Sequence, residues 1–477
     1  MKIVRPSPGC SAANIPALRY PAVGPILEIE GETKVMTHKT LAAVLVLLAS
    51  MTHAGKAADA GAPLAGRWLV TADMHGTPIY GRLEIEQQGQ KITGQFFGDK
   101  LEGSLTGSAI QFVAKNGSGG TLKVDGTLKN DVLSGTVIQT DGADESHSDR
   151  YSFTAIPVRQ VPRVAPVHHE FSPSVFYREF SASNKPVLTV APGDSIHTTT
   201  VDAAGTDHEG HKRVMGGNPQ TGPFYIRSAM PGDTLVVHLT QLRLNRDYAI
   251  SDDAVVGRGL DPNLAARMRE GGKTVLWHLD LAQGLASLQK PGVHMASYTV
   301  PVHPMLGCIA TAPAPSRGAP PTGDSGSYGG NMDFNEIVEG ATIYLPVSVP
   351  GALLYLGDGH AAQGDGELNG NALETSLDVE FTVDVILGRR LPGPRVESST
   401  HIMAMGLAGS LDDAFRGATA NMAAWLTEDH KLTAAEVAEV LGTSAEYKVS
   451  EVADRNAGVV LKINKERLTG LTAGESN

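Results

Sequence analysis

The chain has 477 residues, which is more than one ordinary domain needs and predicts two or three domains. Its formal net charge is −12, and no basic stripe occurs, so nucleic-acid binding is not expected, because phosphates are neutralised by clustered Lys and Arg. Aromatic residues make up only 5% of the sequence, which counts against recognition of sugars or bases by stacking. The 54 glycines indicate many turns.

Residues 1–54 are expected to be a leader that takes no part in the fold. From Met36 the sequence has the pattern of a secretory signal peptide, with Lys39 as its positive charge, Leu41–Ala49 as its apolar run and a small-residue cleavage site at Thr52–Ala54. The apolar run is shorter than the roughly 20 residues that span a bilayer, and a buried core helix is its alternative interpretation. The sequence therefore predicts Met36 as the true start and an exported protein, periplasmic or secreted, without a membrane partner after cleavage.

Cys308 is the one cysteine outside the leader, since Cys10 precedes Met36. The mature chain is therefore expected to have no intramolecular disulfide, even in an exported setting. The apolar neighbours of Cys308 favour an inert buried thiol over a nucleophile.

Residues 64–157 are predicted to form a small all-β domain. Short alternating runs such as Arg82–Glu86 and Lys91–Phe96 recur about every ten residues, and Gly, Asp and Asn separate them. This pattern is typical of antiparallel strands that close into a small barrel or sandwich. We expect a binding or structural role for this domain, and the proline-rich residues 158–167 predict a stiff linker after it.

Residues 168–470 are predicted to form the main domain. Apolar or alternating strands and Pro-Gly-Asp turns fill most of it, and residues 313–331 look like a loop. A helix is predicted from Ser410 to about Leu426, a capping box at Thr433–Glu436 predicts another, and a strand follows at Asn456–Ile463. The predicted fold class is thus mainly β, with a sandwich-like or barrel-like core, a small α+β C-terminal segment and the small N-terminal β domain.

The densest chemistry lies between Asn331 and Glu374. The stretch GDGHAAQGDGE, residues 357–367, directly follows the predicted buried strand Leu353–Leu356 and is expected to be a loop. A rigid strand end can position side chains for binding a cation, zinc through His360 and carboxylates or a hard cation through oxygens, or for taking a proton from water. Solvated acids on a flexible turn are the alternative. The ionisable candidates here are Asp358, His360, Asp365, Glu367 and Glu374.

Two further features are candidates with weaker support. Residues 202–211 place His208 and His211 three residues apart among acids, which fits either a metal-rich surface loop or a site. His303 before Pro304 has a structural interpretation as well as a functional one. No G-x-S-x-G motif occurs, so the sequence gives no local support to a covalent serine mechanism.

In this order, several motifs resemble the acetamidase/formamidase family. The resemblance extends from about His168 to Arg395 and into the C-terminal segment, and each motif alone would be weak. The motifs are GNPQTGP at 217–223, AMPGDTL at 229–235, HPMLGCI at 303–309, GGNMD at 329–333, GDGHAAQGDGE at 357–367 and ALE at 372–374.

The resemblance implies a hydrolase that cleaves the C–N bond of a small linear amide and releases ammonia and a carboxylate. It also implies a β-rich fold, a divalent metal (zinc or calcium) and a homo-oligomer. By motif, we assign Glu367, Asp365 and His360 to catalysis and Asn218, His303, Asn331 and Gln363 to substrate binding. The metal ligands expected are Asp202, Asp333, Asp358, His360 and Glu374.

The chain also departs from the family pattern. It has an export signal and an additional β domain, whereas members are expected to be cytoplasmic and to lack both; Ser228 and Ala310 stand where the family has glycine. The alternative function is therefore an exported, non-catalytic protein that binds a small ligand or a partner on the same fold.

Overall fold

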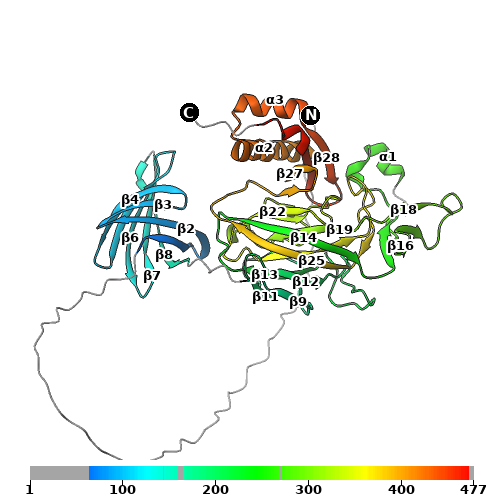
Figure 1. Cartoon of the computed structure of the whole chain (residues 1–477), viewed down its shortest axis with the longest axis horizontal. Coiled ribbons are helices and arrows are strands. Elements are labelled where there is room, and N and C mark those ends of the chain that lie inside the picture. Colours follow the sequence, from blue (N-terminus) through cyan, green and yellow to red (C-terminus); the bar gives the residue numbers. More distant parts are fainter. Residues whose placement is uncertain (1–63, 143, 159–164, 269–270, 472–477) are drawn as a thin grey trace, which may run out of the picture. The chain divides into compact units, whose positions relative to one another are not determined.

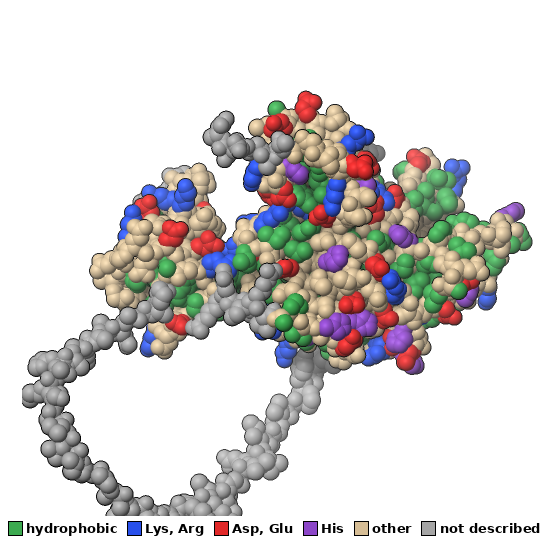
Figure 2. Space-filling view, viewed as in Figure 1, with side chains coloured by type: hydrophobic (Ala, Val, Ile, Leu, Met, Phe, Trp, Pro, Cys, Tyr) green, Lys and Arg blue, Asp and Glu red, His purple; other side chains and the backbone are tan. Residues whose placement is uncertain are grey.

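A computed structural model describes residues 64–142, 144–158, 165–268 and 271–471 (Figure 1). The signal peptide predicted within residues 1–54, including the start at Met36, lies outside the described residues, as does most of the predicted linker. No helix among the described residues has the length and apolar character that crossing a bilayer would require. On the face in Figure 2, acidic and basic side chains are interspersed.

The first unit is a closed barrel in which each strand pairs antiparallel with the next and β1 pairs with β8. Alternation along the strands fills the interior: Ile110, Phe112 and Ala114 of β5 are buried, and their neighbours are more exposed. The strands are β1 (Gly66–Met74), β2 (Thr77–Gln88), β3 (Lys91–Phe96), β4 (Asp99–Thr106), β5 (Ala109–Lys115), β6 (Thr121–Lys129), β7 (Val132–Asp141) and β8 (Asp144–Pro157).

The rest of the chain is built on two sheets. The first has the order β18-β17-β16-β15-β24-β23-β19-β21-β20, and β13 joins it beside β23 with β10 and β11. Its strands are β10 (Phe176–Tyr177), β11 (Leu188–Val190), β13 (Gln220–Ile226), β15 (Tyr248–Asp252), β16 (Thr274–Asp280), β17 (Leu285–Leu288), β18 (Thr299–Pro301), β19 (Met305–Thr311), β20 (Ser325–Gly326), β21 (Gly329–Asn331), β23 (Leu354–His360) and β24 (Glu374–Thr375).

The second sheet has the order β28-β29-β27-β26-β22-β14-β25-β12-β9. Its strands are β9 (His168–Phe171), β12 (Ser195–Thr199), β14 (Thr234–Leu244), β22 (Thr342–Pro346), β25 (Leu377–Ile386), β26 (Arg395–Glu397), β27 (His401–Ala408), β28 (Glu446–Glu451) and β29 (Ala457–Asn464). The helices are η1 (Gly257–Gly259), α1 (Pro262–Arg267), η2 (Pro315–Arg317), α2 (Leu411–His430), α3 (Ala434–Ser444) and η3 (Lys465–Leu468).

One apolar core joins the two sheets. Fully buried side chains of the first sheet, such as Leu306 and Leu356, belong to the same cluster as Val237, Ile343 and Phe381 of the second. This is the packing of a β-sandwich. The predicted mainly-β fold class is therefore confirmed.

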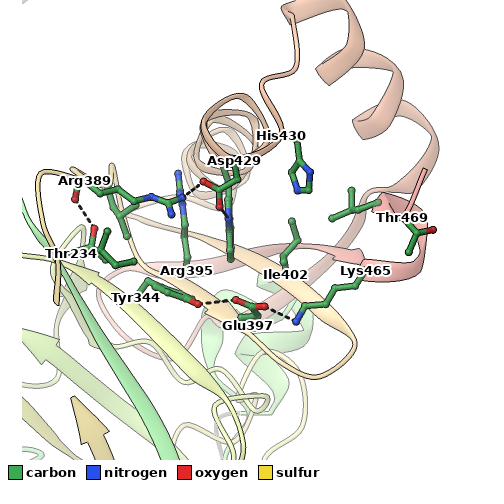
Figure 3. A pocket seen from close by; sticks show the side chains of 14 residues that line it. Thr234, Tyr344, Arg389, Arg395, Glu397, Ile402, Asp429, His430, Lys465 and Thr469 are labelled. Carbon is green, nitrogen blue, oxygen red and sulfur yellow. Dashed lines mark hydrogen bonds and ion pairs between the residues drawn. The ribbon is translucent and has the colours of Figure 1, made fainter. Parts of the chain in front are cut away.

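The C-terminal segment is a layer of two helices on β27 and β29 (Figure 1). The capping box predicted at Thr433 is present at the start of α3, where Thr433 and Glu436 bond each other's backbone N–H groups. A cavity of about 450 Å³ lies between α2 and the sheet, lined by Trp425, Tyr344 and Arg395 among others (Figure 3). Its charged groups are largely paired with one another, as Lys465 with Glu397 is.

Two predicted loops proved partly wrong. Residues 357–360 of the glycine-rich stretch continue β23, because Cys308, Leu306 and Met305 of β19 pair with them. Residues 313–331 contain the short strands β20 and β21, which pair with each other and with β19. In both places the glycines suggested a turn, whereas in the structure they allow neighbouring strands to approach closely.

Gly406 sets how closely α2 packs on β27. A Cβ atom on Gly406 would lie 1.9 Å from the carbonyl oxygen of Ala414 and 2.4 Å from the amide nitrogen of Ala418. Because backbone cannot yield as a side chain can, Gly406→Ala is expected to lower the free energy of unfolding by about 3 kcal/mol. Urea unfolding measures this change. Gly409→Ala, where a Cβ would meet nothing within 4 Å, is the control and should change stability by less than about 0.5 kcal/mol.

Candidate active site

Five ionisable side chains meet at one buried place, which we call the acid–histidine group. Each member is at most 4% exposed. Among the described residues, Lys and Arg form no ion pair with its four carboxyl groups, and the imidazole is the basic side chain beside them. Four buried carboxyl groups around one imidazole must keep protons or hold a cation, because an unpaired buried charge is costly. The members are Asp333, Asp358, His360, Glu367 and Glu374.

The backbone holds three of these acids in an uncommon conformation. Asp333 has φ 39°, Asp358 has φ 60° and Glu367 has φ 49°, all in the left-handed region that non-glycine residues seldom occupy. Such strain persists only where the surrounding structure imposes it, and it concentrates at functional sites. The space beside these acids is provided by Gly307 of β19, where a Cβ atom would lie 2.4 Å from Asp333 Oδ1 and 2.6 Å from Asp358 Oδ2.

His360 directs one ring nitrogen into the group. Its Nδ1 lies 2.9 Å from Gln363 Oε1, and Gln363 uses its amide nitrogen to donate to the carbonyl oxygens of Asp333 and Ser450. Gln363 Oε1 is therefore an acceptor and His360 Nδ1 the donor. Whenever the imidazole is neutral, Nε2 therefore carries its lone pair, and this buried atom has no hydrogen-bond partner.

The protonation of the group is strongly shifted. Burial alone would lower the pKa of His360, but the charges of Glu374 and Asp358 outweigh it and hold this pKa well above the ordinary value. Burial raises the pKa of Glu374 to about 7, with Asp358 adding to the rise and His360 opposing it. Burial, with neighbouring carboxylates adding to it and His360 opposing it, also holds the pKa values of Asp333 and Glu367 well above normal. The group thus retains protons at neutral pH unless a cation replaces them.

The geometry fits a divalent cation. His360 Nε2 lies 3.6 Å from Asp358 Oδ1 and 3.4 Å from Glu374 Oε1. Ligands about 2.0 to 2.2 Å from a tetrahedral zinc lie about 3.3 to 3.6 Å from one another, so these atoms could share one ion. Asp333, His360 and Glu367 form a second set whose ligand atoms lie within 4.8 Å of one another, and Asp333 Oδ1 is buried without a partner.

A chain of buried amides runs away from Asp333. Asn331 Nδ2 donates to Asp333 Oδ2 at 2.6 Å, Asn218 Nδ2 donates to Asn331 Oδ1, and Gln220 Nε2 donates to Asn218 Oδ1 at 2.8 Å. At its far end, Gln220 Oε1 is buried without a partner, and a Cβ on Gly357 would lie 2.7 Å from it. The chain brings Asn218 and Asn331, both predicted to bind substrate, next to the acid–histidine group.

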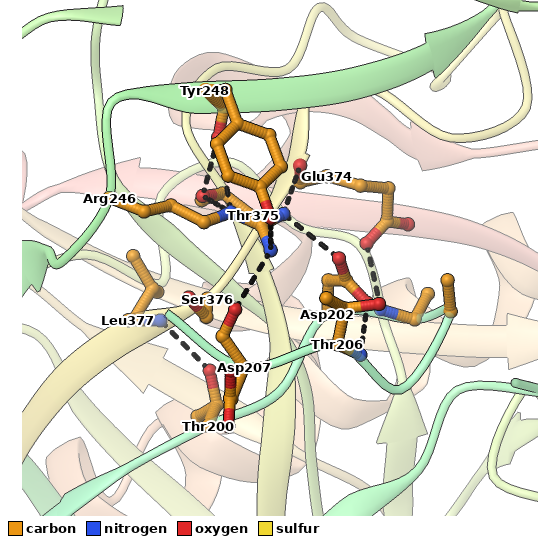
Figure 4. A network of polar contacts seen from close by, with 12 residues as sticks. Thr200, Asp202, Thr206, Asp207, Arg246, Tyr248, Glu374, Thr375, Ser376 and Leu377 are labelled. Carbon is orange, nitrogen blue, oxygen red and sulfur yellow. Dashed lines mark hydrogen bonds and ion pairs between the residues drawn. The ribbon is translucent and has the colours of Figure 1, made fainter. Parts of the chain in front are cut away.

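Asp202 lies beside the acid–histidine group (Figure 4). Its Oδ1 accepts the backbone N–H of Thr206, and its Oδ2 accepts Arg246 Nη2 at 2.9 Å. Arg246 also donates to the backbone oxygen of Glu374 and lies over the ring of Tyr248. Both carboxylate oxygens of Asp202 are thus engaged by Thr206 and Arg246. The structure does not bring them among the proposed metal ligands.

Asp365 and His303 point to the surface instead. Asp365 is exposed, accepts from Asn335 Nδ2 at 2.9 Å and pairs with Lys448 at 3.1 Å. His303 has an exposed side chain, while its backbone N–H donates to the carbonyl oxygen of Ala361. Neither side chain is brought into the acid–histidine group.

Sequence reasoning missed two acids that lie near the group, Glu451 and Asp454. Burial raises the pKa of Glu451 to about 8 and, partly offset by the hydrogen bond from Asn331, raises that of Asp454 to about 6. Asp454 Oδ2 accepts Asn331 Nδ2 at 2.5 Å. No local pattern marks the EVAD stretch that carries both residues. Gln220, in contrast, stands inside the GNPQTGP motif and could have been carried over with Asn218.

The second histidine candidate gives a different result. Asp207, Glu209 and His211 could share a cation by distance, but Glu209 and His211 are exposed. Asp207 already accepts the backbone N–H groups of Glu209 and His211 and pairs with Arg213 at 3.2 Å. Despite burial, these bonds lower the pKa of Asp207, as expected for a turn-stabilising carboxylate. Cys308 is fully buried, and burial raises its pKa well above normal, as an inert thiol requires.

The part of the sequence that forms the site is similar to known amidases. The model of the Acetamidase/Formamidase family matches residues 310–403, which contain Asn331 and all five members of the acid–histidine group. The acetamidase of Mycolicibacterium smegmatis is 44% identical over 61 residues, which is 13% of this chain and 15% of that protein. The matched segment thus spans a small part of that curated relative.

Solved structures extend the likeness to the whole main domain. A predicted acetamidase/formamidase from Thermoanaerobacter tengcongensis has a TM-score of 0.55 and 29% identity, with 65% of this chain and 100% of that chain covered. The chain is thus similar to the acetamidase/formamidase family in sequence and in fold. An acetamidase from Bacillus halodurans matches with a TM-score of 0.54 and 29% identity over 63% of this chain and 99% of its own. The covered share is about the size of the two-sheet unit with its C-terminal layer.

Gly307 should be indispensable for cation binding. Gly307→Ala would displace Asp333 and Asp358, so we expect zinc affinity to fall by about 10- to 100-fold, as when ligand-orienting groups are changed. Isothermal titration of the metal-free protein with Zn²⁺ measures this. Gly364→Ala is the control, because a Cβ there meets nothing within 4 Å. Equal zinc affinity in Gly307→Ala and wild type would contradict the proposed ligand set.

The stability of the metal-free protein should fall as pH rises from about 4.5 to 7. In this window Glu374 keeps its proton in the folded state, where its pKa is about 7, and loses it in the unfolded state. The folded state then binds more protons, and the free energy of unfolding decreases with pH by up to about 1.4 kcal/mol per unit for this group. Urea unfolding in the presence of a chelator at several pH values measures the slope. Glu374→Gln should flatten it, and an unchanged slope would count against this assignment.

Proposed function

We propose that this protein hydrolyses the C–N bond of a small linear amide and releases ammonia and a carboxylate. The acid–histidine group carries the proposal, because it places a base, a set of cation ligands and amide-bearing side chains at one buried point. The acetamidases and the acetamidase/formamidase that the chain resembles support the same reaction. An amide carbonyl is a poor electrophile, so the reaction needs both activation of the carbonyl and removal of a proton from water.

Asp358, His360 and Glu374 are the proposed cation ligands, with Asp333 next to them. A divalent cation held there would polarise the amide carbonyl and make a water molecule more acidic. The imidazole ligand and the spacing of the ligand atoms favour zinc over calcium, which prefers six or more oxygens. Gln363 holds His360 Nδ1 and so keeps Nε2 turned toward these carboxylates.

Glu367 is the proposed general base. It is 4% exposed, and burial holds its pKa well above normal, which brings the carboxylate nearer to the pKa range suited to taking a proton from water. Its carboxylate lies within 4.8 Å of Asp333 and His360 ligand atoms. In the proposed sequence, Glu367 accepts a proton as water adds to the carbonyl carbon and returns it to the nitrogen as the C–N bond breaks.

Asn331 and Asn218 are proposed to line the place of the substrate amide. Both are buried, at 5% and 8% exposed, and they lie on the amide chain that ends at Asp333. The enclosed setting favours short amides over peptides or long acyl chains. We further propose, from the predicted signal peptide and the family resemblance, that the protein is exported and acts as a homo-oligomer.

Glu367→Gln should abolish turnover while the site remains formed. We expect kcat for ammonia release to fall by about 10²- to 10⁴-fold, with zinc affinity and folding largely retained. The measurement is an ammonia assay over formamide, acetamide and propionamide with zinc-loaded protein. Asp365→Asn is the matched control and should stay within about threefold of wild type, because Asp365 is exposed and paired with Lys448.

Two outcomes would contradict the proposal. If Asp365→Asn lost activity and Glu367→Gln kept it, the base would be misassigned. If wild type bound short amides but released no ammonia, the non-catalytic binding protein would be the correct interpretation.

A further inference from the structure

The C-terminal layer reaches the acid–histidine group through the turn between β28 and β29. β28 runs beside the loop that carries Glu367: Gly366 N–H donates to the carbonyl oxygen of Val449 at 3.0 Å, and Val452 N–H donates back to Gly366. Gln363 Nε2 donates to the carbonyl oxygen of Ser450 at 3.2 Å. β28 and the start of the turn after it thus hold Gln363 and Gly366 of this loop in place.

Asp454 stands at the tip of this turn and contacts the amide chain. Asn331 Nδ2 donates one hydrogen to Asp333 Oδ2 at 2.6 Å and the other to Asp454 Oδ2 at 2.5 Å, while Asn331 Oδ1 accepts from Asn218. All hydrogen-bonding atoms of the Asn331 side chain are then engaged, and its amide can take one orientation only. Because Asn331 holds Asp333 Oδ2, Asp333 Oδ1 is left facing the group without a partner.

The turn itself is firmly anchored. Asp454 N–H donates to Glu451 Oε2, and Asn456 Nδ2 donates to Asp324 Oδ1 at 3.0 Å. Asn331 N–H donates to the backbone oxygen of the same Asp324. Asp454 and Asn331 are therefore held against one support, which fixes the distance between them.

We propose that Asp454 is a positioning residue of the site, which orients Asn331 and, through it, directs Asp333 Oδ1 toward the bound cation. The C-terminal layer is then part of the site, although it lies outside the matched residues 310–403. The inference depends on the cation of the proposed function but not on the reaction. Asp454 acts as a hydrogen-bond acceptor here, so Asn can replace it through its own side-chain oxygen, whereas Ala cannot.

Zinc titration of the metal-free full-length protein tests this role. Asp454→Ala is expected to weaken zinc binding by about 10- to 100-fold, and Asp454→Asn to restore it to within about threefold of wild type. Arg455→Ala, in the same turn, removes the ion pair of an exposed guanidinium group with Asp324 and leaves Asp454 unchanged, so it should bind zinc as wild type does. Thermal unfolding without metal should be similar in all variants, which a purely structural role of Asp454 would not allow. If Asp454→Ala does not fold, Asp454→Ser replaces it, because its hydroxyl is too short to reach Asn331.

Three results would overturn the inference: unchanged zinc affinity in the Ala or Ser variant, equal loss in Asp454→Asn, or no binding of Zn²⁺ or Ca²⁺ by wild type. An ammonia assay on the same samples separates this failure from that of the proposed function. Wild type that binds zinc but releases no ammonia refutes the hydrolase and leaves the role of Asp454 intact. Wild type that releases ammonia without binding either cation refutes the role of Asp454 and leaves the hydrolase intact.

Discussion

The main domain has to accommodate four buried carboxyl groups around a single imidazole. Their loss of water and their mutual repulsion are unfavourable and raise the pKa values of Glu374 and Glu367, while the carboxylates raise the pKa of His360 against the effect of its burial. Such an arrangement persists only if the surrounding fold supplies the missing free energy and a cation or protons supply the missing charge. The apolar core thus stabilises a site that is unfavourable by itself. The packing of the core does not require the buried acids.

The support comes from the pairing of β19 with β23 at the centre of the first sheet. Glycine at 307 leaves room for Asp333 and Asp358, and glycine at 357 leaves room for the side chain of Gln220. Apolar side chains of the same two strands, such as Leu306, Ile309 and Leu356, enter the core between the sheets. One pair of strands therefore contributes both to the packing of the sandwich and to the site.

The sequence allowed the prediction of much of this fold, because its strands alternate and its helices carry caps. The strand content, the small N-terminal β domain with its regular turns and the capping box at Thr433 all follow from local patterns. The glycine-rich stretch from residue 357 misled local reasoning, since its glycines serve strand pairing with β19, about 50 residues earlier, as much as turns.

The site was predictable where motifs are contiguous and unpredictable where they are not. His360, Glu367 and Glu374 lie within or beside one dense stretch and do meet in the structure. Asp365 belongs to the same stretch, but it is exposed, because the positive φ values of Gly366 and Glu367 break the regular alternation of side chains along the backbone. Asp454 comes from more than 80 residues away, and no spacing in the sequence connects it to His360.

The contact of β28 with the loop that carries Glu367 has a consequence for the order of events during synthesis. The ribosome makes the turn at Asp454 about 80 residues after Glu374, the last member of the acid–histidine group in the sequence. Most of the sandwich can assemble earlier, but the loop with Glu367 and the orientation of Asn331 remain unset until that turn is in place. A nascent or prematurely ended chain would therefore carry the buried acids without their final arrangement. The arrangement of the site is thus completed only after a later part of the chain has folded onto it.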